Sequence, residues 1–142
     1  MSYQHCGPLP VSTMDVAAAV AEFHQAFGRP MRRHPTAAVD PALARLRVDL
    51  VQEEVGEFAA ASEQGDLIGI ADALADIVYV AYGAARTYGI DLDAVLREVH
   101  RSNMSKLGSD GKPVLRADGK VLKSDRYVRP DIAAALGLLD GA

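Results

Sequence analysis

The feature that most constrains the fold is a series of four helix-length segments separated by short breaks. Two breaks pair a residue that ends helices with one that begins them: Gly65 stands directly before Asp66, and Gly89 stands two residues before Asp91. A further start signal is Asp40-Pro41, an N-cap residue followed by proline in the first turn. Such short breaks favour antiparallel neighbours, so the sequence predicts an all-α fold, a four-to-five-helix antiparallel bundle.

Each expected helix begins at a Ser, Thr or Asp cap, and most end at or near a glycine. The expected ranges are Ser12 or Thr13 to about Phe27, Asp40 to about Gln64, Asp66 to just before Gly89, Asp91 to about Asn103, and a short last helix from Asp131 to Leu136. Asp118-Gly119 lies between two short apolar segments and predicts a small C-terminal hairpin. We expect residues 1–142 to form a single domain, with 1–11 as a loose N-terminal arm and 104–130 as a basic tail.

The longest apolar segment, residues 67–85, requires a test for membrane insertion. Asp72 and Asp76 lie near its centre, and each would cost about 2.5–3.5 kcal/mol to place in a bilayer. We therefore expect a buried helix of a soluble protein and no membrane partner. The N-terminus has no basic stretch followed by an apolar run, so we expect a cytoplasmic protein.

Acidic residues interrupt the apolar faces of the second and third helices. At 100° per residue, Glu53, Glu54 and Glu57 fall within about 60° of the direction of the leucines that precede them. Asp72 and Asp76 lie about 40° apart on one face of the next helix. An unpaired buried carboxylate costs several kcal/mol, so carboxylates that converge from two antiparallel helices predict a site for a hard cation such as Mg²⁺.

Other interpretations of these acidic residues remain open. The Glu53-Glu54 pair can be a solvated helix face, and the two aspartates can be buried partners of Arg45, Arg47 or Arg86. A di-iron bundle is rejected, because it needs Glu-x-x-His motifs and no Glu here has a His three residues later.

The charge of the chain is divided between an acidic body and a basic tail. Residues 97–129 contain nine Lys and Arg against four Asp and Glu, a net charge of +5, which leaves −9 for the rest of a chain whose total is −4. Such a pair of surfaces can hold a complex of a metal with a polyphosphate, although a solvated basic surface has the same composition. Nucleic-acid binding is not expected, because the acidic body dominates and no basic surface with interleaved aromatics is evident.

The order of the motifs resembles that of a known superfamily. Glu54-Val-Gly-Glu57 is followed by Asp72-Ala-Leu-Ala-Asp76, with Glu22-Phe-His-Gln-Ala-Phe-Gly28 before them and His100-Arg-Ser-Asn-Met-Ser-Lys106 after them. This set resembles the all-α NTP pyrophosphohydrolases, the superfamily of MazG, HisE and dimeric dUTPases. Within it, the set resembles a MazG-like branch labelled phosphoribosyl-ATP pyrophosphohydrolase-like. The resemblance covers roughly residues 14–133.

The resemblance implies Mg²⁺-dependent cleavage of a nucleoside triphosphate between its α- and β-phosphates, with Mn²⁺ as a substitute metal. By position, Glu54, Glu57 and Asp76 would be metal ligands. The usual second motif is Glu-x-x-Asp, and here the place of its glutamate is taken by Ala73. Asp72 stands one residue earlier and is the candidate to replace that ligand.

The remaining site residues surround this expected centre. Glu53, beside the ligands, is the candidate to orient or deprotonate the attacking water. Asn103 and Lys106 resemble phosphate-contacting positions of the family, and Lys123 can assist them. Contacts to the base are expected from the first helix, where the candidates are His24, Phe23 and Phe27; a lone His there is more often structural.

Three functions follow from this reading. The leading one is hydrolysis of dUTP, dCTP or a non-canonical NTP to the monophosphate and pyrophosphate, a housecleaning reaction that removes these compounds from the nucleotide pool. The alternatives are hydrolysis of phosphoribosyl-ATP in histidine biosynthesis and a non-catalytic bundle that binds a nucleotide or a partner protein. Self-association as a dimer or tetramer is expected, because short helices with 49% hydrophobic residues leave apolar surface to bury.

Overall fold

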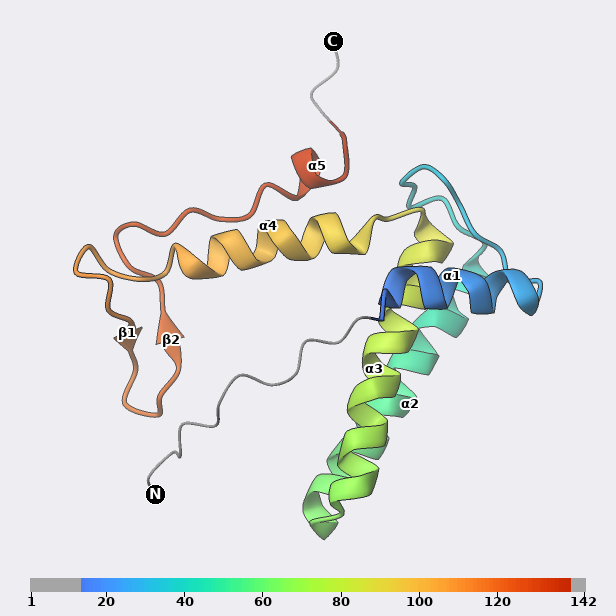
Figure 1. Ribbon diagram of the computed structural model, residues 1–142, viewed down its shortest axis with the longest axis horizontal. Coiled ribbons are helices and arrows are strands. Elements are labelled where there is room, and N and C mark those ends of the chain that lie inside the picture. Colours follow the sequence, from blue (N-terminus) through green and yellow to red (C-terminus); the bar gives the residue numbers. More distant parts are fainter. Residues whose placement is uncertain (1–13, 139–142) are drawn as a thin grey trace.

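The computed structural model describes residues 14–138 and contains helices and one small hairpin (Figure 1). This architecture confirms the expected all-α class with a C-terminal hairpin; the arm expected at residues 1–11 lies outside the described part of the chain. The elements in chain order are α1 (Val16–Ala26), α2 (Pro41–Gln64), α3 (Leu67–Tyr88), α4 (Leu92–Met104), β1 (Val114–Leu115), β2 (Val121–Leu122) and α5 (Ile132–Ala135).

The helices α2 and α3 form an antiparallel pair with the most extensive helix–helix contact among the described residues (Figure 1). The Asp40 carboxylate accepts hydrogen bonds from the backbone N–H groups of Ala42 and Leu43, which begins α2. Gly65 ends α2 in the left-handed conformation, and Asp66 immediately caps α3. This two-residue connection reverses the chain and places the C-terminal half of α2 against the N-terminal half of α3.

The first helix, α1, packs across α3. Its N-cap is Asp15, whose carboxylate accepts a hydrogen bond from the N–H of Ala18, so the expected cap at Ser12 or Thr13 was wrong. All three residue types have capping chemistry and stand within four positions, and the local sequence did not distinguish them. Val20 is fully buried between the helices and, with Ala85, contributes to the small apolar core.

The loop of residues 27–40, which joins α1 to α2, is bound to the end of α3 by backbone hydrogen bonds. Arg32 donates to the carbonyl of Arg86 at 2.9 Å, and Thr36 donates to the carbonyl of Tyr88 at 3.0 Å. Gly89 ends α3 with φ +71° directly against the backbone of this loop. The loop therefore follows the C-terminal turn of α3 closely.

Residues 92–138 form an arm that extends away from the α2–α3 pair (Figure 1). The tail folds back along α4: Ser102 Oγ donates to the carbonyl of Val128 at 2.9 Å, and the N–H of Asp131 donates to Glu98 Oε1 at 2.8 Å. Within the arm, α4 packs on α5 rather than closing a bundle with α2 and α3. The antiparallel arrangement of the bundle is thus formed in this chain by α2 and α3, with α1 across them.

The helix α3 was expected to be buried, but within this single chain only five of its 22 residues are buried, and its N-terminal half carries most of the exposed ones. Ile68, for example, is 83% exposed, and among the described residues the helix packs mainly on α2 and α1. Among the described residues, α3 is the one helix with the length and composition to cross a membrane; its best window has a mean hydropathy of 1.6 and is 11% buried. Length and composition are weak evidence for a span, and Asp72 and Asp76 interrupt the apolar surface. An exposed apolar surface of this kind is typical of contact surfaces between proteins.

Candidate functional site

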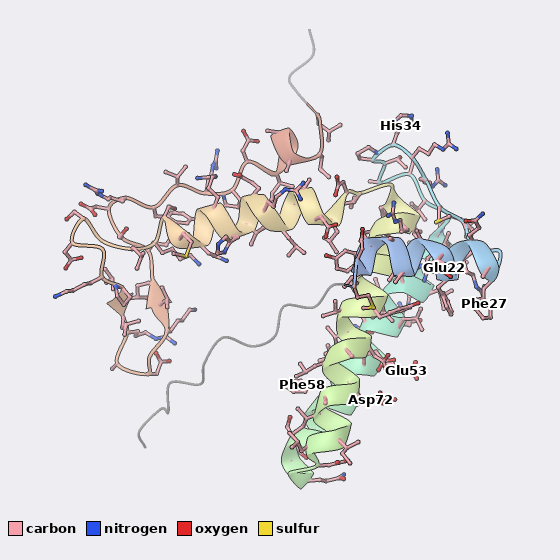
Figure 2. The ribbon with its side chains drawn as sticks, in the orientation of Figure 1. Glu22, Phe27, His34, Glu53, Phe58 and Asp72 are labelled. Atoms are coloured by element: carbon pink, nitrogen blue, oxygen red, sulfur yellow. The ribbon has the colours of Figure 1, made fainter. Side chains whose placement is uncertain are left out.

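Four of the predicted acidic residues gather at the α2–α3 interface. Glu54 is partly buried and interacts electrostatically with Glu57 and Glu53 on its own helix and with Asp76 on α3. We call these four residues the carboxylate cluster. Figure 2 shows Glu53 and the neighbouring Asp72 projecting to the same side of the helix pair. The structure therefore brings together three predicted metal ligands and the predicted water-orienting residue.

Glu54 carries most of the electrostatic cost of this arrangement. Burial, followed by the negative charges of Glu57, Asp76 and Glu53, raises the pKa of the Glu54 carboxyl above its usual value. Its Oε2 atom is buried and has no hydrogen-bond partner among the described residues. A buried acceptor surrounded by like charge is unfavourable unless a cation or a proton compensates it. The residues present thus fit a hard divalent ion, whose preferred ligands are carboxylate oxygens.

The fourth predicted ligand, Asp72, lies at the edge of this cluster. Its side chain is exposed, and it is not among the groups that raise the pKa of Glu54. Within residues 14–138, no three Asp, Glu, His or Cys side chains are placed closely enough to hold a metal ion without rearrangement. Binding an ion therefore requires rotation of the carboxylate side chains, and the ligand set stays a prediction.

The arginines that were alternative partners for the aspartates are engaged elsewhere. Arg45 pairs with Asp49 at 2.9 Å, and Arg86 donates to the carbonyl of Ala17 at 3.2 Å. Arg47 donates through Nε to Thr87 Oγ1 at 2.8 Å. No ion pair between these arginines and Asp72 or Asp76 occurs in the described chain. The interpretation of the two aspartates as partners of buried arginines is therefore not supported.

His24, the predicted base contact, is buried between α1 and α3. A β-carbon built on Gly83 would lie 3.1 Å from His24 Nε2, so the missing side chain at Gly83 makes room for the imidazole. Burial and then the charge of Arg47 lower the pKa of His24, which favours the neutral ring. The other predicted base contacts are exposed instead: Phe23 on α1 is 40% exposed and Phe27, the residue that ends this helix, is 65% exposed.

The predicted phosphate contacts lie on the arm, away from the carboxylate cluster of the same chain. Asn103 is exposed in the last turn of α4, Lys106 follows that helix, and Lys123 follows β2. The Lys123 ammonium lies over the ring of Tyr127 at 4.7 Å from its centroid. Figure 1 shows the end of α4 and the hairpin projecting away from the α2–α3 pair. Within one chain, the structure does not bring these residues to the predicted metal ligands.

Two features at the other end of the helix pair were not predicted from the sequence. Arg47 is buried without a carboxylate partner, and its Nη2 atom has no hydrogen-bond partner in the described chain. A cavity of about 820 Å³ lies between α1, the 27–40 loop, the end of α3 and the start of α4. At its wall the Tyr82 hydroxyl donates to Asp93 at 2.6 Å, a bond that raises the pKa of Tyr82 to about 12. These contacts join residues distant in sequence, so no local pattern could reveal them.

Comparison with known proteins identifies the family. The profile of the phosphoribosyl-ATP pyrophosphohydrolase family matches residues 20–103, which include most of α1, all of α2 and α3, and most of α4. The chain belongs to the phosphoribosyl-ATP pyrophosphohydrolase family, and this membership confirms the resemblance to the all-α NTP pyrophosphohydrolases.

Two individual proteins are similar to this chain. The uncharacterized protein L479 of Acanthamoeba polyphaga mimivirus is 35% identical over 109 residues, which are 75% of this chain and 41% of the viral protein. The chain thus spans less than half the length of that relative. A crystal structure from Exiguobacterium sp. 255-15, provisionally described as an NTP pyrophosphohydrolase, is 25% identical, with a TM-score of 0.47 over 89% of this chain and 96% of that one.

Proposed function

We propose that this protein is a Mg²⁺-dependent nucleoside triphosphate pyrophosphohydrolase that converts a (d)NTP, such as dUTP, dCTP or a non-canonical NTP, to its monophosphate and pyrophosphate. The observation that carries the proposal is the carboxylate cluster around Glu54, which has negative charge and a buried oxygen without a hydrogen-bond partner, and which no cation from residues 14–138 compensates. Membership of the family supports the same reaction class.

The residues divide the proposed reaction between them. Glu54, Glu57 and Asp76 would hold Mg²⁺, with Mn²⁺ as a substitute, and the ion would supply positive charge to the phosphate oxygens. Glu53 is exposed beside these ligands, where it can accept a hydrogen bond from the attacking water and take its proton. Bond cleavage between the α- and β-phosphates then releases pyrophosphate and leaves the monophosphate.

We also propose that the protein acts as a dimer or tetramer whose basic arm meets the carboxylate cluster of a neighbouring copy. Two observations support this: the apolar surface of α3 is largely uncovered, and the arm carries its lysines away from the cluster of its own chain. The arm is basic and the helical body is acidic, so the two surfaces attract each other. Lys106 and Lys123 of one copy would then contact the phosphates held by another.

The first experiment measures pyrophosphate release from dUTP, dCTP, the other NTPs and phosphoribosyl-ATP, with and without Mg²⁺. We expect Glu57→Gln to abolish turnover without loss of helical structure, because it removes one negative ligand. The matched control is Glu63→Gln, an exposed glutamate on α2 outside the cluster, and it should retain activity. Unchanged turnover in Glu57→Gln would refute the metal-site assignment.

The same panel separates the candidate functions. The family name favours phosphoribosyl-ATP as a second candidate substrate, and turnover of that compound alone would assign the reaction of histidine biosynthesis. Metal-dependent binding of nucleotides with no turnover of any compound would instead indicate the non-catalytic alternative.

A mixing experiment tests the contribution of the arm from another copy. Lys106→Ala should raise KM for triphosphates more than it changes Mg²⁺ affinity. In an equal mixture of Glu57→Gln and Lys106→Ala that exchanges subunits, half of the dimers are mixed and each has one intact site. At a substrate concentration far below the KM of Lys106→Ala, where both parent variants are nearly inactive, we therefore expect about a quarter of wild-type activity. No recovery in proven mixed dimers would show that each chain completes its own site.

A further inference from the structure

The contact between α1 and α3 is formed on the α1 side by two buried side chains, Val20 and His24, which stand one turn apart. Val20 is fully buried and His24 is 3% exposed, so both lie against the neighbouring helices. A valine cannot change its charge, whereas a histidine gains or loses a proton near neutral pH. One of the two buried side chains of α1 is therefore a group that can titrate.

The imidazole of His24 and the guanidinium of Arg47 approach the same small space. A β-carbon built on Gly83 would lie 3.1 Å from His24 Nε2 and 3.6 Å from Arg47 Nη1. The guanidinium is held there by its hydrogen bond to Thr87 Oγ1 at 2.8 Å. His24 Nδ1 and Arg47 Nη2 are both buried and have no hydrogen-bond partner among the described residues. A protonated ring donates from both nitrogens, so its Nδ1–H group would be left without an acceptor.

The charged groups that act on the His24 ring are all positive. Within residues 14–138 they are Arg47 of α2, Arg86 of α3 and Arg29 of the 27–40 loop, and no carboxylate is among them. The backbone of Pro30 acts in the opposite direction, because it accepts a hydrogen bond from the ring. Burial and these cations together keep the pKa of His24 below its ordinary value of 6.5. Protonation of the ring therefore adds a further positive charge to a group of three arginines.

We propose that His24 is a proton-sensitive lock on the contact between α1 and α3. The neutral ring packs against Gly83 and keeps α1 in place, and protonation of the ring releases α1 from α3. The direction follows from linkage, because a released ring is exposed to water and binds a proton at its ordinary pKa of 6.5, more readily than the packed ring does. The contact thus has its full strength above pH 6.5 and weakens as the pH falls toward the lower pKa of the packed ring. This inference does not depend on the reaction proposed above.

Release of α1 also reaches the surroundings of the carboxylate cluster. Phe23, the residue before His24, contacts Tyr79 of α3 edge-to-face, with ring centroids 5.7 Å apart. Tyr79 follows Asp76 by three residues on α3, which is about one helical turn. A proton taken up by His24 therefore changes the packing one turn away from a predicted metal ligand.

The test follows hydrogen exchange at the amides of residues 20–26 of α1 between about pH 5 and pH 8, with each rate divided by its intrinsic rate at that pH. His24→Gln and His24→Phe remove the titrating group. His34→Gln is the matched control, because His34 is exposed on the 27–40 loop (Figure 2). A local measurement is needed because the raised pKa of Glu54 gives global unfolding a pH dependence of the opposite sign.

In wild type and in His34→Gln, the protection of these amides should be constant above about pH 6.5. Below that pH it should fall by up to about tenfold per pH unit, because one proton is taken up on release. In both His24 variants the protection should not depend on pH. Constant protection of the wild type down to about pH 5 would overturn the proposal, and so would the same fall in His24→Gln.

A second pair of variants leaves the buried ring in place. Arg29→Gln removes an exposed cation that acts on His24, and Arg33→Gln removes an exposed cation of the same loop that is not among the groups acting on it. The pKa of His24 is measured by nuclear magnetic resonance from the Cε1 proton of the ring. We expect a higher pKa in Arg29→Gln than in wild type, and the wild-type value in Arg33→Gln. Equal values in all three proteins would show that the arginines do not control the charge of the ring, and the proposal would be wrong.

Discussion

The two glycines that end α2 and α3 provide a sharp test of how the helix pair is held together. Gly65 and Gly89 both cap their helices in the left-handed conformation, with φ of 67° and 71°. Their surroundings differ. A β-carbon at Gly65 would meet no atom within 4 Å, whereas a β-carbon at Gly89 would collide with the backbone carbonyl of His34 in the 27–40 loop. The Gly65→Ala and Gly89→Ala variants therefore share one cost, and only the second adds another.

The magnitudes follow from these contacts. An L-residue in the left-handed region costs about 1–2 kcal/mol, and this applies to both substitutions. At Gly89 the loop must also move, because backbone atoms cannot yield as a flexible side chain can. That movement breaks the two backbone hydrogen bonds between the loop and the end of α3, each with a net contribution of about 1 kcal/mol. We expect a loss of about 3–4 kcal/mol for Gly89→Ala and about 1–2 kcal/mol for Gly65→Ala.

The assay is urea unfolding followed by far-ultraviolet circular dichroism, with all variants at one protomer concentration because self-association would shift the midpoint. Hydrogen exchange at the amides of Arg32 and Thr36 gives a local readout, and protection there should fall in Gly89→Ala alone. Losses that agree within about 0.5 kcal/mol in the two variants would contradict the reasoning. Such a result would mean that the contact between Gly89 and the loop adds nothing beyond backbone strain.

Three further predictions concern buried charge, the arm and the metal site. Within the described residues, Arg47 is a buried guanidinium without a carboxylate partner, which is a costly arrangement. In urea titrations, Arg47→Met should therefore leave the free energy of unfolding unchanged or raise it by up to about 4 kcal/mol. A loss of more than about 2 kcal/mol would contradict this prediction. Hydrogen bonds from Arg101 and from the N–H of Asp131 lower the pKa of Glu98 to about 2. The stabilisation of the tail by ionised Glu98 is therefore complete above the ordinary pKa of about 4.5 and is lost as the pH falls through about 2. Hydrogen exchange of the Asp131 amide should show this pH dependence in the wild type and not in Glu98→Gln. Asp76→Asn removes one negative charge from the carboxylate cluster, so it should raise the melting temperature measured without metal. It should also reduce the increase in melting temperature that Mg²⁺ produces. An increase as large as that of the wild type would exclude Asp76 as a metal ligand.

The helix boundaries were largely predictable because their signals are local. An Asp that caps a helix is satisfied by N–H groups two or three residues away, and Asp40, Asp66 and Asp91 all do this. The glycine stops at Gly65 and Gly89 act within one turn. The first cap was mistaken for the same reason, since Asp15 offers the same local chemistry as the residues just before it.

The parts that could not be predicted depend on distant residues. Arg47 and Thr87 are 40 positions apart, and nothing near either residue indicates the other. The exposed apolar face of α3 was not predicted either, because a helix pattern records only that a face is apolar, not which surface meets it. The same limit applies to Lys106, which follows α4 on the arm and lies away from the carboxylate cluster of its own chain. The motifs occur in the order of the family, but the order of motifs does not determine where each residue lies in space.

The replacement at position 73 limits the number of ligands that α3 can provide. Ala73 is 2% exposed and faces the packing between the helices, so a glutamate at this position would reach toward the carboxylate cluster from within. Asp72 begins 100° away around the helix and is exposed, and its short side chain does not recreate that approach. The small residue at 73 also leaves Glu54 facing one negative charge from α3, that of Asp76, instead of two. With alanine at this position the metal-free protein carries a smaller electrostatic cost than it would with a glutamate, and a metal held here would depend on Glu54, Glu57 and Asp76 and on oxygen atoms of water or substrate.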